Sequence, residues 1–404
     1  MIRYIPLIFS LILVIGIPSR ALAKECPSSL PANLYDIEGA DLSLGGELRG
    51  VYTYLNEADS TLPEPKRENI HHGAGFLRGM LSWYPSDELT LTIVPEVRVL
   101  PDPNCAYDYM DHPVVPLLRE AVVEYDAERF RVSAGRQNLV FGSQAVLDAF
   151  FDAAEVEARF DPVSIAVFGG VLVPELAREY LSCQFASYYE ERGAWKDLCL
   201  TAWGDDLAAG GWIALRALKP WSLKALYLYQ KTVDGSLDAH IANLFASGPI
   251  VDPLSFEIEF INMIKSDTVT YLPGFTAALF VAIDEFDVRG GYAGAFRASA
   301  ENRFTPVFEA FRLGERQRYG LYGGHTKYVS LKYKPAWSRP VGYLAGYYLH
   351  SREVDTRPDS DEIDGGFTIE IGPKYRFWVV YSALNLAGDL AVAHGLRVEV
   401  RIIF

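Results

Sequence analysis

The chain has 404 residues, a formal net charge of −15 at pH 7 and four cysteines. This acidic balance argues against nucleic acid as a partner, because binding to phosphates requires a basic surface. The 24 tyrosines, 22 phenylalanines and 7 tryptophans are high counts. They are expected where rings of aromatic side chains lie at the two interfaces of a membrane.

Residues 1–23 predict a cleaved secretory signal. Arg3 gives a positive start, an apolar run extends from Ile5 to Ile17, and Ala21-Leu22-Ala23 forms a small-x-small cleavage pattern. The apolar run is shorter than the roughly 20 residues of a membrane-spanning helix. We expect a mature chain of one domain, residues 24–404, because no Pro/Gly/Ser-rich linker divides it.

The mature chain is expected to contain no transmembrane helix, because no stretch approaches about 18 consecutive apolar residues. Two kinds of protein remain. One is a soluble extracytoplasmic protein, such as a β-sandwich or a β-solenoid. The other is a membrane β-barrel, since only helices and closed barrels satisfy every backbone polar group in lipid.

Segments of alternating apolar and polar residues recur along the whole chain. In the first, Leu42, Leu44 and Leu48 alternate with Ser43 and Glu47. This period of two is typical of a strand with one apolar and one polar face. We predict 18 strands, at residues 42–55, 76–84, 89–99, 118–125, 129–140, 155–160, 163–172, 211–218, 222–231, 238–246, 254–264, 274–283, 286–295, 327–334, 341–350, 366–371, 375–383 and 393–404.

The links between these segments differ in length. Short links such as 219–220 and 284–285 look like turns, whereas long polar links look like loops, at 56–73, 101–117, 141–153, 174–208, 296–325 and 351–364. Val173–Tyr189 is the best candidate for a short helical piece. Together these features predict an all-β, antiparallel transmembrane β-barrel of about 18 strands, with short periplasmic turns and long extracellular loops, in a Gram-negative outer membrane.

The last predicted strand ends its apolar row of Leu396, Val398, Val400 and Ile402 on Phe404. This ending resembles the closing strand of bacterial outer-membrane barrels, in which a terminal Phe is the assembly signal. We therefore expect the barrel-assembly machinery, through Phe404, and outer-membrane lipid as partners. A closed barrel has no free strand edge that requires a partner, so we expect a monomer.

Charged side chains occupy the rows opposite the apolar ones and would line the lumen. Unpaired charges are too costly for a dry core, so a water-filled interior is expected. They serve either as salt bridges that hold the wall or as a path for an anionic solute. The candidate lining residues are Arg49, Arg78, Arg98, Glu120, Glu124, Arg136, Arg159, Arg216, Arg289, Arg397 and Arg401.

Four cysteines in an oxidising compartment allow three disulfide connectivities. The preferred pair is Cys183 with Cys199, which leaves Cys26 with Cys105. A metal site is the less favoured alternative, because the sequence contains no Cys-x-x-Cys spacing. We predict no cofactor.

Residues 118–168 resemble the alginate-export family of outer-membrane porins. The similarity lies in Leu118-Arg119-Glu120-Ala121, in 135–142 (Gly-Arg-Gln-Asn-Leu-Val-Phe-Gly) and in Ala158-Arg159-Phe160-Asp161. The resemblance implies a monomeric 18-stranded barrel whose electropositive constriction passes an anionic polysaccharide. It further implies that Arg136 and Arg159 form the basic lining, oriented or gated by Glu120 and Glu124. A small anionic solute is the alternative cargo.

A second class of function is an outer-membrane barrel enzyme or a surface-interaction barrel that acts through its long loops. The sequence contains no Gly-x-Ser-x-Gly elbow, phosphate-binding loop or His-Glu-x-x-His motif. His71 and His72 are adjacent, but neighbours in a chain point in different directions and lack a third ligand nearby. We therefore predict a channel without catalytic activity.

Overall fold

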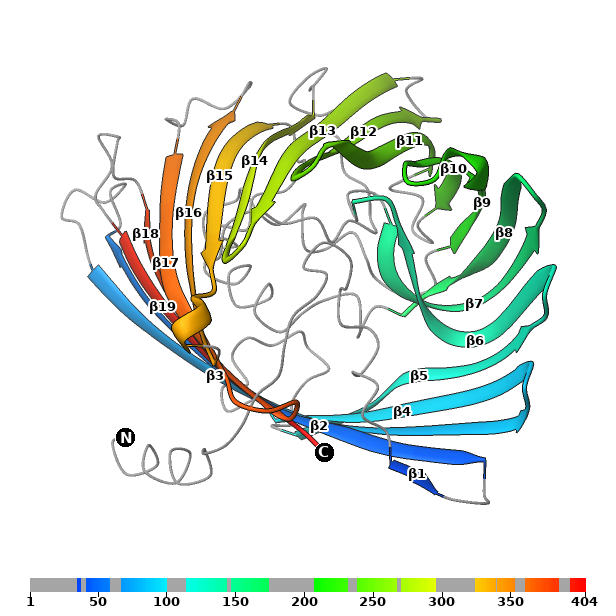
Figure 1. Cartoon of the computed structure of the whole chain (residues 1–404), viewed down its shortest axis with the longest axis horizontal. Helices are drawn as coiled ribbons and strands as arrows, with labels where there is room; N and C mark the ends of the chain where they lie inside the picture. Colours follow the sequence, from blue (N-terminus) through cyan, green and yellow to red (C-terminus); the bar gives the residue numbers. More distant parts are fainter. Residues whose placement is uncertain are drawn as a thin grey trace.

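The computed structural model describes residues 35–37, 41–58, 67–99, 114–143, 147–173, 207–231, 238–266, 270–295, 324–338, 340–352, 360–384 and 393–404. In this part of the chain, 19 strands form one sheet (Figure 1). They are β1 (Tyr35–Ile37), β2 (Leu42–Ala58), β3 (Arg67–Ser86), β4 (Leu89–Val99), β5 (Val114–Asp126), β6 (Phe130–Phe141), β7 (Leu147–Arg159), β8 (Val163–Leu172), β9 (Leu207–Leu215), β10 (Ser222–Lys231), β11 (Asp238–Val251), β12 (Leu254–Lys265), β13 (Thr270–Ile283), β14 (Phe286–Ala295), β15 (Gly324–Tyr333), β16 (Val341–Arg352), β17 (Ser360–Glu370), β18 (Tyr375–Leu384) and β19 (Ala393–Ile403).

Strands β2 to β19 form a closed antiparallel barrel. Each pairs with the next along the chain, and β19 pairs with β2 to close the ring. β1 is a short addition along the start of β2. Removing it from the 19-stranded sheet leaves 18 strands, the number predicted from the sequence, and each predicted segment overlaps one of them.

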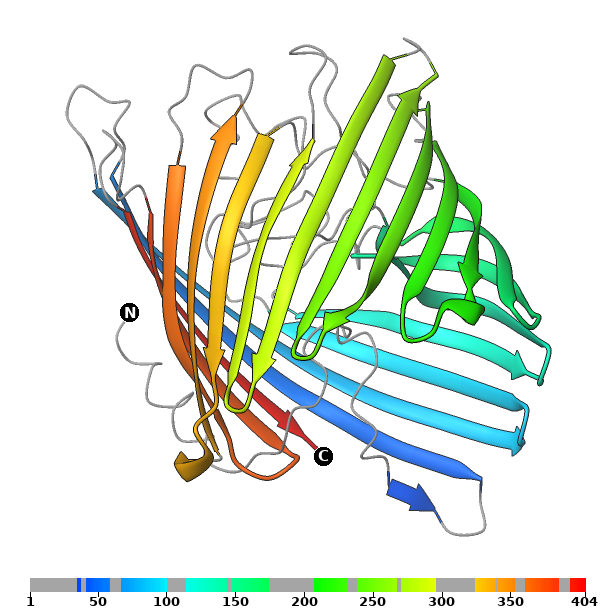
Figure 2. The same cartoon turned by 45° about the horizontal axis from the view of Figure 1, so that its top comes forward.

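The two ends of the barrel differ in their connections, as Figure 2 shows. At one end, which we call the turn end, each link between consecutive strands has at most seven residues, whereas several links at the other end are longer; the start of β2 and the end of β19 also lie at the turn end. The other end, the loop end, carries the remaining links. The predicted loops 56–73, 141–153 and 351–364 are too long, because β3, β7 and β17 begin within them. Residues 174–189, which include most of the predicted helical piece, lie outside the described residues.

The period of two places apolar side chains outward and polar side chains inward. On β2, Leu44 is 41% exposed on the outer face, whereas Glu47 is 1% exposed on the inner face. Trp83 and Val99 are likewise exposed, while Arg78 and Arg98 are buried. Among the described residues, no helix is long and apolar enough to cross a membrane.

The loop-end halves of β6 and β7 leave the wall and enter the lumen (Figure 1). Pairing between β5 and β6 stops at Ala121 and Arg136, after which β6 pairs with β7 alone. Gly135 permits the departure, since its φ is +119° and a Cβ there would lie 2.1 Å from the Ala121 carbonyl oxygen. We call the loop-end part of this hairpin, residues 137–151, the inserted hairpin.

The inserted hairpin packs against the inner face of the opposite wall. Leu139, Phe141, Leu147 and Phe151 form a buried cluster with inward residues of β10 to β13, such as Met263. Beyond the end of β6, Ser143 contacts the buried carboxylate of Glu259 on β12. One side of the lumen is therefore filled by an apolar core.

Candidate functional site: an arginine-rich wall of the lumen

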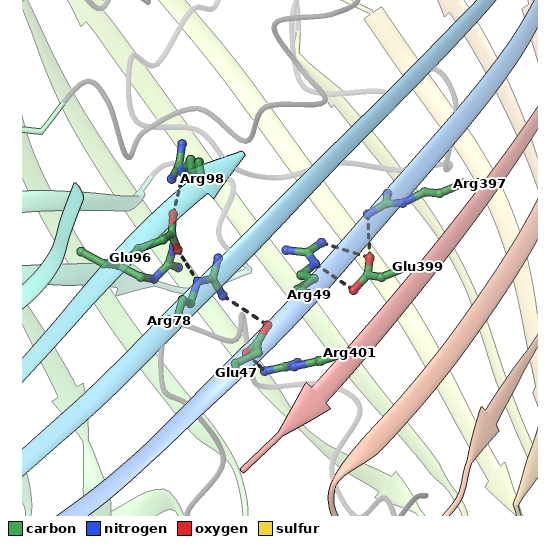
Figure 3. Close-up of polar contacts among 9 residues, drawn as sticks. Glu47, Arg49, Arg78, Glu96, Arg98, Arg397, Glu399 and Arg401 are labelled. Atoms are coloured by element: carbon green, nitrogen blue, oxygen red, sulfur yellow. Dashed lines mark hydrogen bonds and ion pairs between the residues drawn. The ribbon is translucent and has the colours of Figure 1, made fainter. Parts of the chain in front are cut away.

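Nine charged side chains cluster on the inner face of five strands, β19 and β2 to β5. We call them the arginine cluster. Its members are Arg49, Arg78, Arg98, Arg119, Arg397, Arg401, Glu47, Glu96 and Glu399, and Figure 3 labels all of them except Arg119. Strand register brings them together, because Glu47 pairs with Arg78, Arg78 pairs with Glu96, and Arg49 pairs with Arg401.

Glu96 is the centre of one half of the cluster. Its carboxylate accepts a hydrogen bond from Arg78 Nε and another from Arg98 Nε at 2.5 Å. Arg119 Nη1 lies 3.6 Å away on the neighbouring strand. Three guanidinium groups thus surround one buried carboxylate, and charge-assisted bonds of this kind are roughly twice as strong as neutral ones.

The other half lies across the closure between β19 and β2. Arg49 makes a two-pronged contact with Glu399, with Nε to Oε1 at 2.9 Å and Nη2 to Oε2 at 3.0 Å. Arg397 donates to the same carboxylate at 3.1 Å. Arg401 donates to Glu47 at 2.7 Å, so ion pairs connect the last strand to the first strand of the closed barrel.

The arginine cluster has an excess of positive charge. Six arginines against three glutamates leave +3 within the cluster, and the neighbouring Glu120, which interacts with Arg119 and Arg78, offsets one of these charges. The whole chain, by contrast, carries −15. Guanidinium groups remain protonated in proteins, so this excess is fixed. The ring of Phe76 separates three of them, with the Cζ atoms of Arg49, Arg78 and Arg98 between 5.5 and 5.9 Å from its centroid.

Packing keeps the guanidinium groups in place. The six arginine side chains are 6 to 13% exposed, so each shows only a small part of its surface. The salt-bridge role expected from the sequence is therefore present in the wall. Salt bridges alone would require only as many arginines as glutamates, so they do not explain the excess of arginines.

Arg289 and Arg159 also lie on the inner face, outside the cluster. Arg289 is on β14, with its Cζ 4.8 Å from the Phe280 ring, and its side chain is 36% exposed. Arg159 lies at the turn end of β7 and bonds to Asp126 at 2.5 Å and to Glu157 at 3.2 Å.

Two predicted lining residues, Arg136 and Arg216, lie apart from the arginine cluster. Arg136 lies in the row opposite Ser133 and Leu139, and its Nε and Nη2 donate to Asp152 at 2.8 Å. It also donates to the Leu118 carbonyl at 3.0 Å, at the point where β6 leaves β5. Arg216 lies in an exposed turn between β9 and β10. The alternation along β6 indicates the position of Arg136, because Ser133 faces inward and Arg136 is three residues further on.

Glu120 and Glu124 were expected to orient or gate Arg136 and Arg159, whereas the acids that bond to these arginines are Asp152 for Arg136 and Asp126 and Glu157 for Arg159. Glu124 instead lies 3.6 Å from Arg131. Glu120 is opposite Val94 in the register, next to Arg119.

The prediction missed Arg119 as a lining residue because it lies at an irregularity in the strand. Pro95 pairs with Leu118 and Val94 with Glu120, so Arg119 has no register partner on β4. Proline within a sheet is typical of such bulges. Arg119 consequently faces Glu96 and also stacks on Phe150 of the inserted hairpin, at 4.4 Å.

The disulfide prediction cannot be compared with the structure, because Cys26, Cys105, Cys183 and Cys199 lie outside the described residues. Within the described ranges, no group of three His, Cys, Asp or Glu side chains could hold a metal ion.

No protein-family model and no curated protein matches the chain. Solved structures do match. Pseudomonas aeruginosa OccK11 (OpdR) is similar with a TM-score of 0.63 and 11% identity, over 90% of this chain and 96% of that one. P. aeruginosa OpdK, solved with vanillate, gives 0.62 and 9% over 89% and 98%. Acinetobacter baumannii OccAB4 gives 0.60 and 10% over 93% and 100%.

The chain therefore has the fold of a Gram-negative outer-membrane porin, with an apolar outer face suited to lipid. Only this broader class is supported by the structural matches. The resemblance to alginate-export porins rests on the sequence motifs.

Proposed function

We propose that the protein is a passive outer-membrane channel selective for small anionic solutes, above all carboxylates. The observation that carries this proposal is the positive excess of the arginine cluster on the lumen wall of an acidic protein. Clusters of fixed charge in a pore select ions of the opposite sign. The planar guanidinium group matches the geometry of a carboxylate, which favours this class of anion.

Two further observations favour a small solute over the polysaccharide that the alginate-export resemblance implies. The inserted hairpin fills the side of the lumen next to β10–β13 with an apolar core. The apolar side offers few polar contacts to a bulky hydrated polymer. A small anion can pass along the opposite, arginine-rich wall alone. OpdK, which shares the fold, was solved with vanillate, a small carboxylate.

The proposal is tested by ion selectivity in planar bilayers. Arg98→Gln combined with Arg397→Gln lowers the excess of the cluster from +3 to +1. Both glutamates keep an arginine partner, because Glu96 retains Arg78 and Glu399 retains Arg49. We expect the wild type to prefer chloride over potassium and the double variant to lose most of that preference, with a shifted reversal potential in a salt gradient.

Arg216→Gln is the matched control, since it removes one charge from an exposed turn instead of the lumen wall. It is expected to keep the wild-type selectivity. Small carboxylates and alginate oligomers are then compared as blockers of the current. Cation preference in the wild type, or unchanged selectivity in the double variant, would refute the proposal, and block by the oligomers alone would favour the polysaccharide.

A further inference from the structure

Three tyrosine–histidine pairs recur at the same height on the outer face of the barrel. Tyr227 Oη lies 2.6 Å from His240 Nδ1, and Tyr381 Oη lies 2.5 Å from His394 Nδ1. Tyr292 and His325 make the same contact. These are all the histidines whose side chains fall within the described residues. We call the three pairs the tyrosine–histidine band.

The pairs share one geometry. In each, the histidine lies on the next strand, two residues closer to the loop end than the register partner of the tyrosine. Tyr227 pairs with Ala242, Tyr292 with Lys327 and Tyr381 with Leu396, whereas the histidines are His240, His325 and His394. The strand pairs involved are β10–β11, β14–β15 and β18–β19, so the band recurs every four strands.

The band faces away from the lumen. Tyr227 and Tyr381 are exposed in the same outward rows as the apolar side chains. Each histidine is within the first three residues of its strand at the loop end. In a porin the loop end is extracellular, so the band lies where the outer leaflet of the membrane meets water.

Hydrogen bonding to tyrosine fixes the chemistry that each ring presents. When the phenol donates to Nδ1, the neutral imidazole carries its proton on Nε2. The second nitrogen of His240 and His394 is then a donor held in one orientation. Lys327, the register partner of Tyr292, adds an exposed positive charge on the same face. Lys231 contributes less, because Asp238 is its register partner.

We propose that the tyrosine–histidine band binds the phosphate-bearing headgroups of outer-leaflet glycolipid. An oriented N–H donor complements a phosphate, whose oxygens only accept hydrogen bonds, and Lys327 adds a cation beside the Tyr292–His325 pair. Aromatic rings at this height already match a membrane interface, which makes a lipid the occupant that the surface suits. The band thus anchors the barrel at its outer rim and is independent of the lumen.

The test compares thermal unfolding of the barrel in two kinds of vesicle, phosphatidylethanolamine alone and phosphatidylethanolamine containing lipid A. Ligand binding to the folded state raises the unfolding temperature. We expect such an increment for the wild type with lipid A. The combined variant Tyr227→Phe, Tyr292→Phe and Tyr381→Phe keeps the aromatic surface but no longer orients the imidazoles, and should lose at least about half of the increment.

A second variant, His240→Phe with His325→Phe and His394→Phe, removes the donors themselves and should lose more. Tyr343→Phe is the control, because this exposed outward tyrosine lies at the turn end of β16. It is expected to keep the full increment. An equal increment in the tyrosine variant and the wild type, or no increment in the wild type, would overturn the proposal, as would equal loss in Tyr343→Phe.

Discussion

The strength with which the inserted hairpin is held across the lumen can be worked out from its contacts. Two kinds of interaction compete for this role. Glu259 accepts hydrogen bonds from the Ser143 backbone N–H at 3.1 Å, from the Ser143 hydroxyl and from Asn243 Nδ2 at 2.6 Å. Leu139 and Phe141 belong to the buried apolar cluster.

The magnitudes favour the apolar cluster. Glu259→Gln keeps an acceptor oxygen and loses at least one bond to a charged group, worth roughly 1.5–3 kcal/mol. Relief from burying a charge offsets part of that loss. By contrast, Leu139→Ala with Phe141→Ala removes two buried side chains, at a cost of roughly 5–10 kcal/mol for the pair. We expect Glu259→Gln to leave the hairpin in place and the double variant to release it.

Single-channel recording in planar bilayers separates these outcomes. Glu259→Gln should keep the wild-type unitary conductance, whereas the double variant should show a larger or fluctuating one. Replacing residues 137–151 with a short Gly-Ser turn provides the reference for an absent hairpin. Our reasoning fails if Glu259→Gln conducts like that reference while the double variant behaves like the wild type.

Two further substitutions test the wall itself. Gly46→Val should slow or prevent closure of the barrel, because a Cβ at this position would lie 2.4 Å from the Phe404 ring. Backbone hydrogen bonds of 2.7 and 3.0 Å join the same two residues across the closure. The folded fraction is read from heat-dependent gel mobility, and Gly46→Ala is expected to show a milder defect. Asp152→Asn removes the acid that pairs with Arg136 at the point where β6 leaves β5. Because the pair is largely exposed, the change should destabilise the barrel by only about 1 kcal/mol or less in denaturant titrations. Adding Arg136→Gln should recover most of that stability, and no recovery would show that the pair is not the cause.

The strands were predictable because most of them separate lipid from water. Where one face is apolar and the other polar, the period of two is visible in the sequence, as in Leu44 and Glu47. No strand was predicted at residues 147–154, because the adjacent Phe150 and Phe151 interrupt the alternation of apolar and polar residues. At these two positions the inserted hairpin buries both of its faces, with Phe150 against Leu117 and Phe151 against the apolar cluster. Alternation is lost wherever a strand leaves the wall.

The candidate site was predictable only in part. Arg49, Arg78 and Arg98 follow from alternation within regular strands, and the structure places them together as the register requires. Motif similarity instead singled out Arg136, which lies outside the arginine cluster, where β6 leaves β5. The excess of charge at one place depends on which strands are neighbours, and above all on closure between β19 and β2.

That closure has a kinetic consequence. Arg49 and Glu399 are 350 residues apart in the chain, and Arg401 and Glu47 are 354 apart, so their pairing is among the most non-local contacts possible here. Contacts of such high order form last, after the intervening hairpins have folded. An open, incompletely assembled sheet therefore lacks the ion pairs that join Arg49 to Glu399 and Arg401 to Glu47, and leaves their charges along its two free edges. Arg49 attracts Glu399 and Arg401 attracts Glu47, so the strand pairing that closes the barrel also completes the arginine cluster.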